Sequence, residues 1–326
     1  MSLRLRSPGT SRRTTSAAQA DRADTRSPAA LARLSDEALL DAVQLQAFRF
    51  FWNSADPASS LAPDRCTTRA DSGDGLVAIG GSGFGMLATL AAIERGWVGR
   101  QQALDRFDRM VGVLQQATRH HGAWPHFMNG ASGATIPFGP HDDGGDLVET
   151  SFLCMGLLCA RQYFSGAAPQ EVRLRLRIDE CWHAVEWDWY TRGAGDVLYW
   201  HWSPACGWAM NHAVRGWNEC LITYVLAAAS PTHPVDPQVY HRGFASGPGF
   251  LNGNSYYGMQ LPLGMPYGGP LFFAHYSFCG LDPQGLRDRY ADYWLQNRHH
   301  ALIHHAYCAA NPQGHPGYGA QCQSFQ

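Results

Sequence analysis

From residue 35 onward, hydrophobic residues recur at helical spacing along most of the chain. Ser35 predicts the N-cap of a helix that runs to about residue 53, with Leu39, Val43 and Phe48 on its apolar side. A Gly/Asp-rich loop follows this segment. After the loop the pattern changes to an almost entirely apolar helix near 83–95.

An apolar helix followed by an amphipathic helix then recurs along the chain. The predicted helices are 83–95 (apolar), 99–120 (amphipathic), 147–164 (apolar), 169–187 (amphipathic), 218–229 (apolar, opening a third pair) and 285–304 (amphipathic). A helix that is hydrophobic on all sides must be enclosed, and its amphipathic neighbours can enclose it. We therefore expect an all-α fold of the (α/α)6 toroid kind, decorated by a short hairpin around 196–212. Strand alternation is too sparse for a Rossmann fold or a TIM barrel.

Composition narrows the class of protein. The chain has 326 residues, 45% of them hydrophobic, which suffices to bury a large core. The net charge is only −2, so we expect no nucleic-acid partner. No run of 18 apolar residues occurs, so we expect no membrane insertion. We expect a monomer.

The N-terminal residues differ in composition from the remainder. Residues 1–34 carry seven Arg and two Asp among many Ser, Thr and Ala, and we predict a disordered leader or linker there. Arg12-Arg13 resembles the start of a twin-arginine signal, but no apolar segment follows, so the leader contains no convincing signal peptide. Residues 35–326 are predicted to form one domain.

Several chemistries are excluded by residue type. All 25 basic residues are arginine, so no Schiff-base or P-loop lysine exists. Nine cysteines contain no CxxC pair, and His300 and His304 lack an HExxH context, so we expect neither a metal nor another cofactor. The 11 Trp and 13 Tyr suit both core packing and the apolar faces of sugar rings.

The segment Pro140–Thr150 concentrates carboxylates at the start of an apolar helix. Asp146 and Glu149 have the spacing of a capping box, which is the purely structural interpretation. That interpretation leaves Asp142 and Asp143 unexplained. A second polar loop, Arg215-Gly216-Trp217-Asn218-Glu219, enters the apolar helix 218–229.

Glu219 in that second loop has two interpretations. It is either a first-turn acid that favours the helix dipole, or a buried acid with a raised pKa, as a general acid requires. Together the two segments predict the acid/base pair of a glycosidase. We take Glu219, Glu149, Asp142 and Asp146 as the candidate catalytic residues.

Further side chains are candidate substrate contacts. Asp64 and Arg65 either bind sugar hydroxyls or pair with each other. Trp187-Asp188-Trp189 and Trp200-His201-Trp202 are either sugar platforms or parts of a packed hairpin. His275 and Tyr276 lie in an apolar run, where a core histidine is the ordinary interpretation. The candidate substrate-binding residues are Asp64, Arg65, Asp143, Trp200, Trp217, His275 and Tyr276.

These residues also carry a family resemblance. The segments Gly83-Phe84-Gly85, Glu94-Arg95-Gly96-Trp97, His141 to Glu149, Ala160 to Phe164, Ser230 to Pro234, Gly268 to Ser277 and Asp288 to Trp294 resemble the glucoamylase-like bacterial proteins, in particular glycoside hydrolase family 144, the β-1,2-glucanases. The resemblance covers about residues 36–320.

The resemblance implies an (α/α)6 toroid, also called a six-hairpin glycosidase fold, that hydrolyses β-1,2-glucan with inversion and without a metal. Members either cut internally or release sophorose from an end, and their functional acids correspond to Asp142, Asp146, Glu149 and Glu219. The substrate implies a periplasmic or secreted protein. Members also continue past the position matched by Cys322, so we expect a toroid that is incomplete at its C-terminus, which leaves the activity of this chain an open question on the sequence.

Two other functions remain open on the sequence. A toroid-fold polysaccharide lyase or sugar epimerase would use His275 and Tyr276 as base and acid, and a lyase would release an unsaturated product that absorbs in the ultraviolet. A non-catalytic glucan-binding remnant would bind the polymer without turnover.

Overall fold

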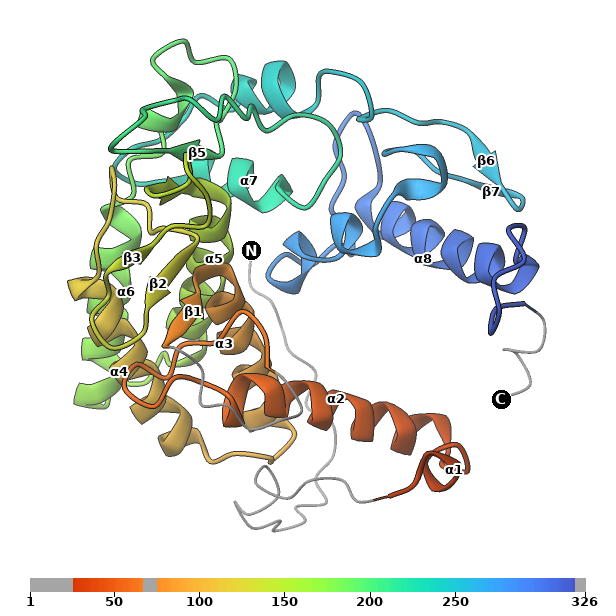
Figure 1. Ribbon diagram of the computed structural model, residues 1–326, viewed down its shortest axis with the longest axis horizontal. Helices are drawn as coiled ribbons and strands as arrows, with labels where there is room; N and C mark the ends of the chain where they lie inside the picture. The colour runs from red at the N-terminus through yellow and green to blue at the C-terminus, as the bar shows by residue number, and fades with distance from the viewer. Residues whose placement is uncertain (1–25, 67–74, 320–326) are drawn as a thin grey trace.

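The computed structural model describes residues 26–66 and 75–319, which are mostly helical. The α-helices of this part are α1 (Pro28–Leu31), α2 (Asp36–Asn53), α3 (Ile79–Glu94), α4 (Arg100–Gln116), α5 (Leu147–Tyr163), α6 (Pro169–His183), α7 (Leu221–Ala229) and α8 (Tyr293–Ala310). In Figure 1 the chain follows an open arc, with α2 near one end and α8 near the other. Residues 1–25 of the predicted leader and Cys322 lie outside the described residues.

The apolar helices pack in the order α3, α5, α7, and the amphipathic helices α4 and α6 pack on each other beside them. Eleven of the 17 residues of α5 are buried, on all sides of its first three turns, whereas α4 buries one face, at positions three or four residues apart between Ala103 and Leu114. Enclosed apolar helices covered by amphipathic ones are what the sequence pattern predicted. The mostly helical class is confirmed, and the (α/α)6 toroid stays a prediction.

Two glycines let α3 and α5 approach until their backbones touch. A Cβ atom on Gly83 would collide with the carbonyl of Phe152, and one on Gly156 would collide with the carbonyl of Gly83. Neither glycine has a positive φ, so close approach, and not a special backbone conformation, requires them. The contact brings the N-terminal turn of α3 beside the N-terminal turn of α5.

Short antiparallel strands fix the loops that precede these turns. One sheet has the order β1 (Leu76–Ala78), β2 (Phe127–Asn129), β3 (Thr135–Ile136). The strand β4 (Gly145–Asp146) pairs with β5 (His201–Trp202), with Asp146 opposite His201. A third pair, β6 (Ser255–Tyr256) and β7 (Met259–Gln260), lies near α8.

Several predicted boundaries differ from the structure. The helix expected at 285–304 begins only at Tyr293, because Asp292 caps it, and the helix expected at 218–229 begins at Leu221. The third apolar helix is followed by a short π-helix, η3 (Tyr240–Phe244), and by short 3-10 helices before α8. The helix α1 overlaps the end of the predicted leader, residues 1–34, whose extent stays a prediction.

The hairpin predicted at 196–212 is present, with bridges between Tyr199 and Ala213 and between Ser203 and Gly207. Among the described residues, no helix combines the length and the apolar character needed to cross a bilayer.

Candidate active site

The acid-rich loop ends at Asp146, which caps α5. Its Oδ1 atom accepts a hydrogen bond from the backbone N–H of Glu149 at 2.9 Å, as the predicted cap requires. The second half of the capping box does not form. Instead, the Oε2 atom of Glu149 accepts a hydrogen bond from the backbone N–H of Gly80 on α3 at 2.8 Å. Glu149 is therefore held across the contact between two helices and is not used to cap its own helix.

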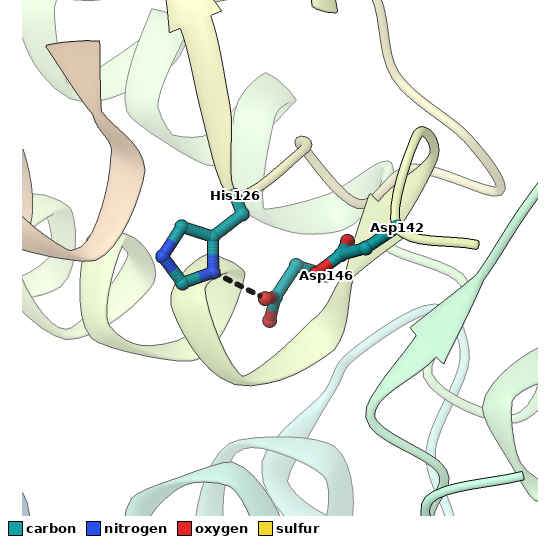
Figure 2. Close-up of side chains that lie close together, drawn as sticks. All are labelled: His126, Asp142 and Asp146. Carbon is teal, nitrogen blue, oxygen red and sulfur yellow. Dashed lines mark hydrogen bonds and ion pairs between the residues drawn. The ribbon is translucent and has the colours of Figure 1, made fainter. Parts of the chain in front are cut away.

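Asp146 has a histidine partner. Nδ1 of His126, just before β2, lies 3.0 Å from Oδ2 of Asp146, and Figure 2 shows this pair beside Asp142. Burial alone would lower the pKa of His126, but the hydrogen bond and the charge of Asp146 outweigh it and raise that pKa to about 9. Burial likewise opposes ionisation of Asp146, yet His126 and His201 hold its pKa below the ordinary value. The pair is an imidazolium–carboxylate contact in which Asp146 is fully buried and His126 is partly exposed.

Asp142 lies next to this pair and is also buried. Nε2 of His201 on β5 lies 3.8 Å from Oδ2 of Asp142 and 3.9 Å from Oδ2 of Asp146. Burial, followed by the charge of Asp146, raises the pKa of Asp142. One strand pair thus brings a histidine against two carboxylates.

Glu149 is the acid whose protonation is most altered near neutral pH. Burial raises its pKa to about 7, and the charges of Asp146 and Glu219 add to the rise, while His126 and the Gly80 N–H oppose it. A carboxyl group that keeps its proton near pH 7 has the property of a general acid.

Glu219 lies in the turn that leads into α7. Ser277 fixes this turn, because its Oγ atom donates to the Glu219 carbonyl at 2.7 Å and accepts from the Ile222 N–H at 3.0 Å. Burial raises the pKa of the Glu219 carboxyl. The charge of Glu219 acts on Glu149, so the two predicted segments face a common region of the molecule.

Tyr276 borders the same region. Its ring packs against Phe84, Phe152 and Phe272, and burial together with the charges of Glu219 and Glu149 raises the pKa of its hydroxyl. The neighbouring His275 is an exposed residue whose pKa burial lowers.

The other predicted substrate contacts have varied surroundings. Asp64 and Arg65 form an ion pair with each other at 2.6 Å. The Trp217 ring is 2% exposed and stacks on Tyr293, so the structure places it in the hydrophobic core. Trp200 stacks on His212.

Asp143 lies near His120 and the acid group. Burial lowers the pKa of His120 against the opposing charge of Asp143, and burial and Asp146 raise the pKa of Asp142 with a smaller addition from Asp143.

Sequence reasoning did not assign His126 or His201 to the site, nor the Gly80 amide. His201 carried a signal, since it occupies the centre of the Trp200-His201-Trp202 alternation and a strand sends alternate side chains to opposite faces. His126 carried none, because its contact with Asp146 depends on the pairing of β2 with β1 beside α3.

Within residues 26–66 and 75–319, the atoms of His126, Asp142 and Asp146 are close enough to hold a metal ion, lying within 4.8 Å of one another. Nδ1 of His126 carries the proton that it shares with Asp146, so a metal would have to displace that proton. The ion pair already balances the charge of Asp146.

A mostly helical fold with carboxylates gathered at the ends of enclosed apolar helices is the class of the helical glycosidase folds. Residues 211–323 match the family model described as "Putative glucoamylase". The chain is 49% identical to the endo-β-1,2-glucanase of Chitinophaga pinensis, with a TM-score of 0.83 over 88% of this chain and 70% of that one.

Two relatives from Parabacteroides distasonis are longer. A β-1,2-glucanase structure is 44% identical, with a TM-score of 0.84 over 88% of this chain and 43% of that one. A curated exo-β-1,2-glucooligosaccharide sophorohydrolase acting at the non-reducing end is 44% identical over 308 residues, which are 89% of this chain. The chain spans 42% of the length of that curated relative.

The chain belongs to the glucoamylase-like family, with relatives of the glycoside hydrolase family 144 type, as its motifs predicted.

Proposed function

We propose that this protein hydrolyses β-1,2-glucan by general acid–base catalysis with carboxylates. The observation that carries the proposal is Glu149, a buried acid with a pKa of about 7 that is anchored to the Gly80 N–H and lies within electrostatic reach of Glu219. The substrate class follows from the activities of relatives that are 44–49% identical.

Glu149 is the proton donor in this proposal, and Glu219 is the base. Burial, joined by the charges of Asp146 and Glu219, favours the proton on Glu149, whereas burial alone raises the pKa of Glu219. Glu149 gives its proton to the glycosidic oxygen as the bond to the anomeric carbon breaks. Glu219 takes a proton from the water whose oxygen attacks that carbon from the opposite side, so the configuration inverts.

Asp146 and Asp142 serve the reaction in different ways. Asp146 is a positioning residue, because it caps the turn that carries Glu149 and is itself held by His126. Asp142, with His201 beside it, binds sugar hydroxyls. We further propose that α3, α5 and α7 are inner helices of an (α/α)6 toroid, which would place all these acids at one end of the inner ring.

The first test is incubation of the protein with linear β-1,2-glucan and chromatography of the products. We expect β-1,2-linked oligosaccharides, and NMR of the fresh product should show inverted anomers. Failure of the protein to release any sugar would overturn the proposal.

The roles of the two glutamates are tested with an aryl sophoroside whose nitrophenolate leaves without protonation. Glu149→Gln should lose most activity on the polymer but keep it on the aryl substrate, because that leaving group needs no acid. Glu219→Gln should lose activity on both. If instead Glu219→Gln kept activity on the aryl substrate and Glu149→Gln lost it, Glu219 would be the acid and Glu149 the base. Full activity of both variants on the polymer would refute both roles.

A further inference from the structure

A partly exposed aromatic cluster lies at β5, outside the acid site. We use the name aromatic cluster for Trp189, Trp202, Trp208 and His121. Because adjacent residues of a strand point to opposite faces, Trp202 points away from the acids that His201 faces. Its ring centroid lies 4.9 Å from that of His121 and 6.4 Å from that of Trp189.

Trp189 is the exposed member of the cluster, with 40% of its surface accessible. His121 stacks on this indole with 3.7 Å between centroids and 14° between ring planes. A hollow of about 400 Å³ borders the indole and is lined by Asp188, Trp189, Arg192, Gly193 and Trp208. His121 is not part of this lining, so the hollow presents a part of the indole that the stacked imidazole does not cover.

The charged groups of the hollow make contacts within the protein. Arg192 donates from Nη1 to Oδ1 of Asn211 at 2.8 Å, and its guanidinium lies 3.5 Å from the Tyr199 ring centroid. Asp188 Oδ1 lies 3.2 Å from Nδ1 of His233. The hollow carries one carboxylate and one guanidinium beside an open indole, which favours a ligand that has no net charge and has both an apolar face and hydroxyl groups.

We propose that this hollow is a second carbohydrate-binding site, which takes a stretch of the glucan chain lying beyond the reaction site. A pyranose ring would stack its C–H face on Trp189 while its hydroxyls reach the Asp188 carboxylate, more than half of whose side chain is exposed. This inference rests on the proposed function for the identity of the sugar.

A second site has a consequence that depends on chain length. A polymer that occupies the hollow and the reaction site together gains effective concentration at the acids, whereas a trisaccharide occupies one site at a time. The hollow should therefore increase kcat/KM for the polymer more than for the trisaccharide.

The kinetic test compares Trp189→Ala with the wild type on long β-1,2-glucan and on a β-1,2-linked trisaccharide. Loss of one aromatic stacking contact should lower the polymer-to-trisaccharide ratio of kcat/KM about tenfold. Trp189→Phe should retain part of the ratio. Trp294→Ala is the matched control, because Trp294 on α8 is 48% exposed and lies outside the cluster.

The binding test uses Glu219→Gln, so that the polymer is not consumed, and measures its affinity by calorimetry. Adding Trp189→Ala should raise the Kd for the polymer about tenfold. An unchanged Kd together with an unchanged kinetic ratio would overturn the second site while leaving the hydrolase proposal intact. A protein that binds the polymer through Trp189 but releases no sugar would support the second site and overturn the hydrolase proposal.

Discussion

Replacing Gly80 with alanine adds one methyl group that should lower the catalytic rate and leave the stability of the protein nearly unchanged. A Cβ atom there would lie 2.5 Å from Oε2 of Glu149 and 3.1 Å from Cδ2 of Phe152. For ordinary contact at 3.4 Å, the carboxylate must retreat by about 0.9 Å, from 2.5 to 3.4 Å. The backbone of Gly80 is not left-handed, and alanine is favoured over glycine in a helix by about 1 kcal/mol. The cost of moving the side chain is thus largely offset in the folded state.

The catalytic step has no such compensation. A misplacement of about 1 Å costs roughly 100-fold in rate, or about 2.7 kcal/mol of activation free energy. We expect Gly80→Ala to lower kcat on β-1,2-glucan about 100-fold and to shift Tm by less than about 4 °C. Reducing-sugar release and a thermal melt measure the two quantities.

Gly81→Ala is the control for this experiment, because the added methyl would meet only the methyl of Ala78, at 3.3 Å. If Gly80→Ala kept the wild-type kcat while Glu149→Gln was inactive, the anchoring of the carboxylate by α3 would have no part in catalysis.

The remaining predictions concern pH and one further side chain. Since Glu149 must hold its proton to act, kcat should fall as the pH rises through about 7, and a pH–rate profile still flat at pH 9 would contradict this role. The pKa of His126 is raised, so its contribution to stability is complete below pH 6.5 and is lost as the pH rises through about 9. Asp146→Asn should lower the free energy of unfolding by about 3 kcal/mol at pH 6, and urea melts of this variant should show a weaker dependence of stability on pH. Ser277→Ala should cost about 1–3 kcal/mol and lower kcat through the Glu219 turn; normal kcat would show that the hydroxyl serves stability alone.

Local sequence patterns predicted the elements of this fold well where one physical effect dominated. The helices α3, α5 and α7 were found because apolar residues fill them, and α2 because Ser35 caps it and accepts the N–H of Ala38. The start of α8 was misplaced because the charged residues of 285–292 suit an amphipathic helix as well as a loop. There the cap at Asp292 decides the boundary.

The sequence indicated which acids form the candidate site, but not which hydrogen-bond partners hold them. The sequence indicated Asp142, Asp146, Glu149 and Glu219, because carboxylates before apolar helices are unusual. It could not indicate that Glu149 would accept from Gly80, 69 residues away, since the bond depends on the packing of α3 against α5. Trp217 was predicted to contact substrate because it lies in a polar loop, but its ring packs in the hydrophobic core.

The packing of α3 against α5 also explains why Glu149, of all these acids, is poised near neutral pH. Four carboxyl groups in a buried region cannot all ionise without charged partners. His126 bonds directly to Asp146 and stabilises its charge, and that charge then opposes the ionisation of Glu149, whose own partner is a single backbone N–H from Gly80. His126 therefore acts on Glu149 in two opposite ways, lowering its pKa by direct attraction and raising it by keeping Asp146 ionised. Any change that weakens the His126–Asp146 pair therefore changes the pKa of Glu149, even when Glu149 itself is not mutated.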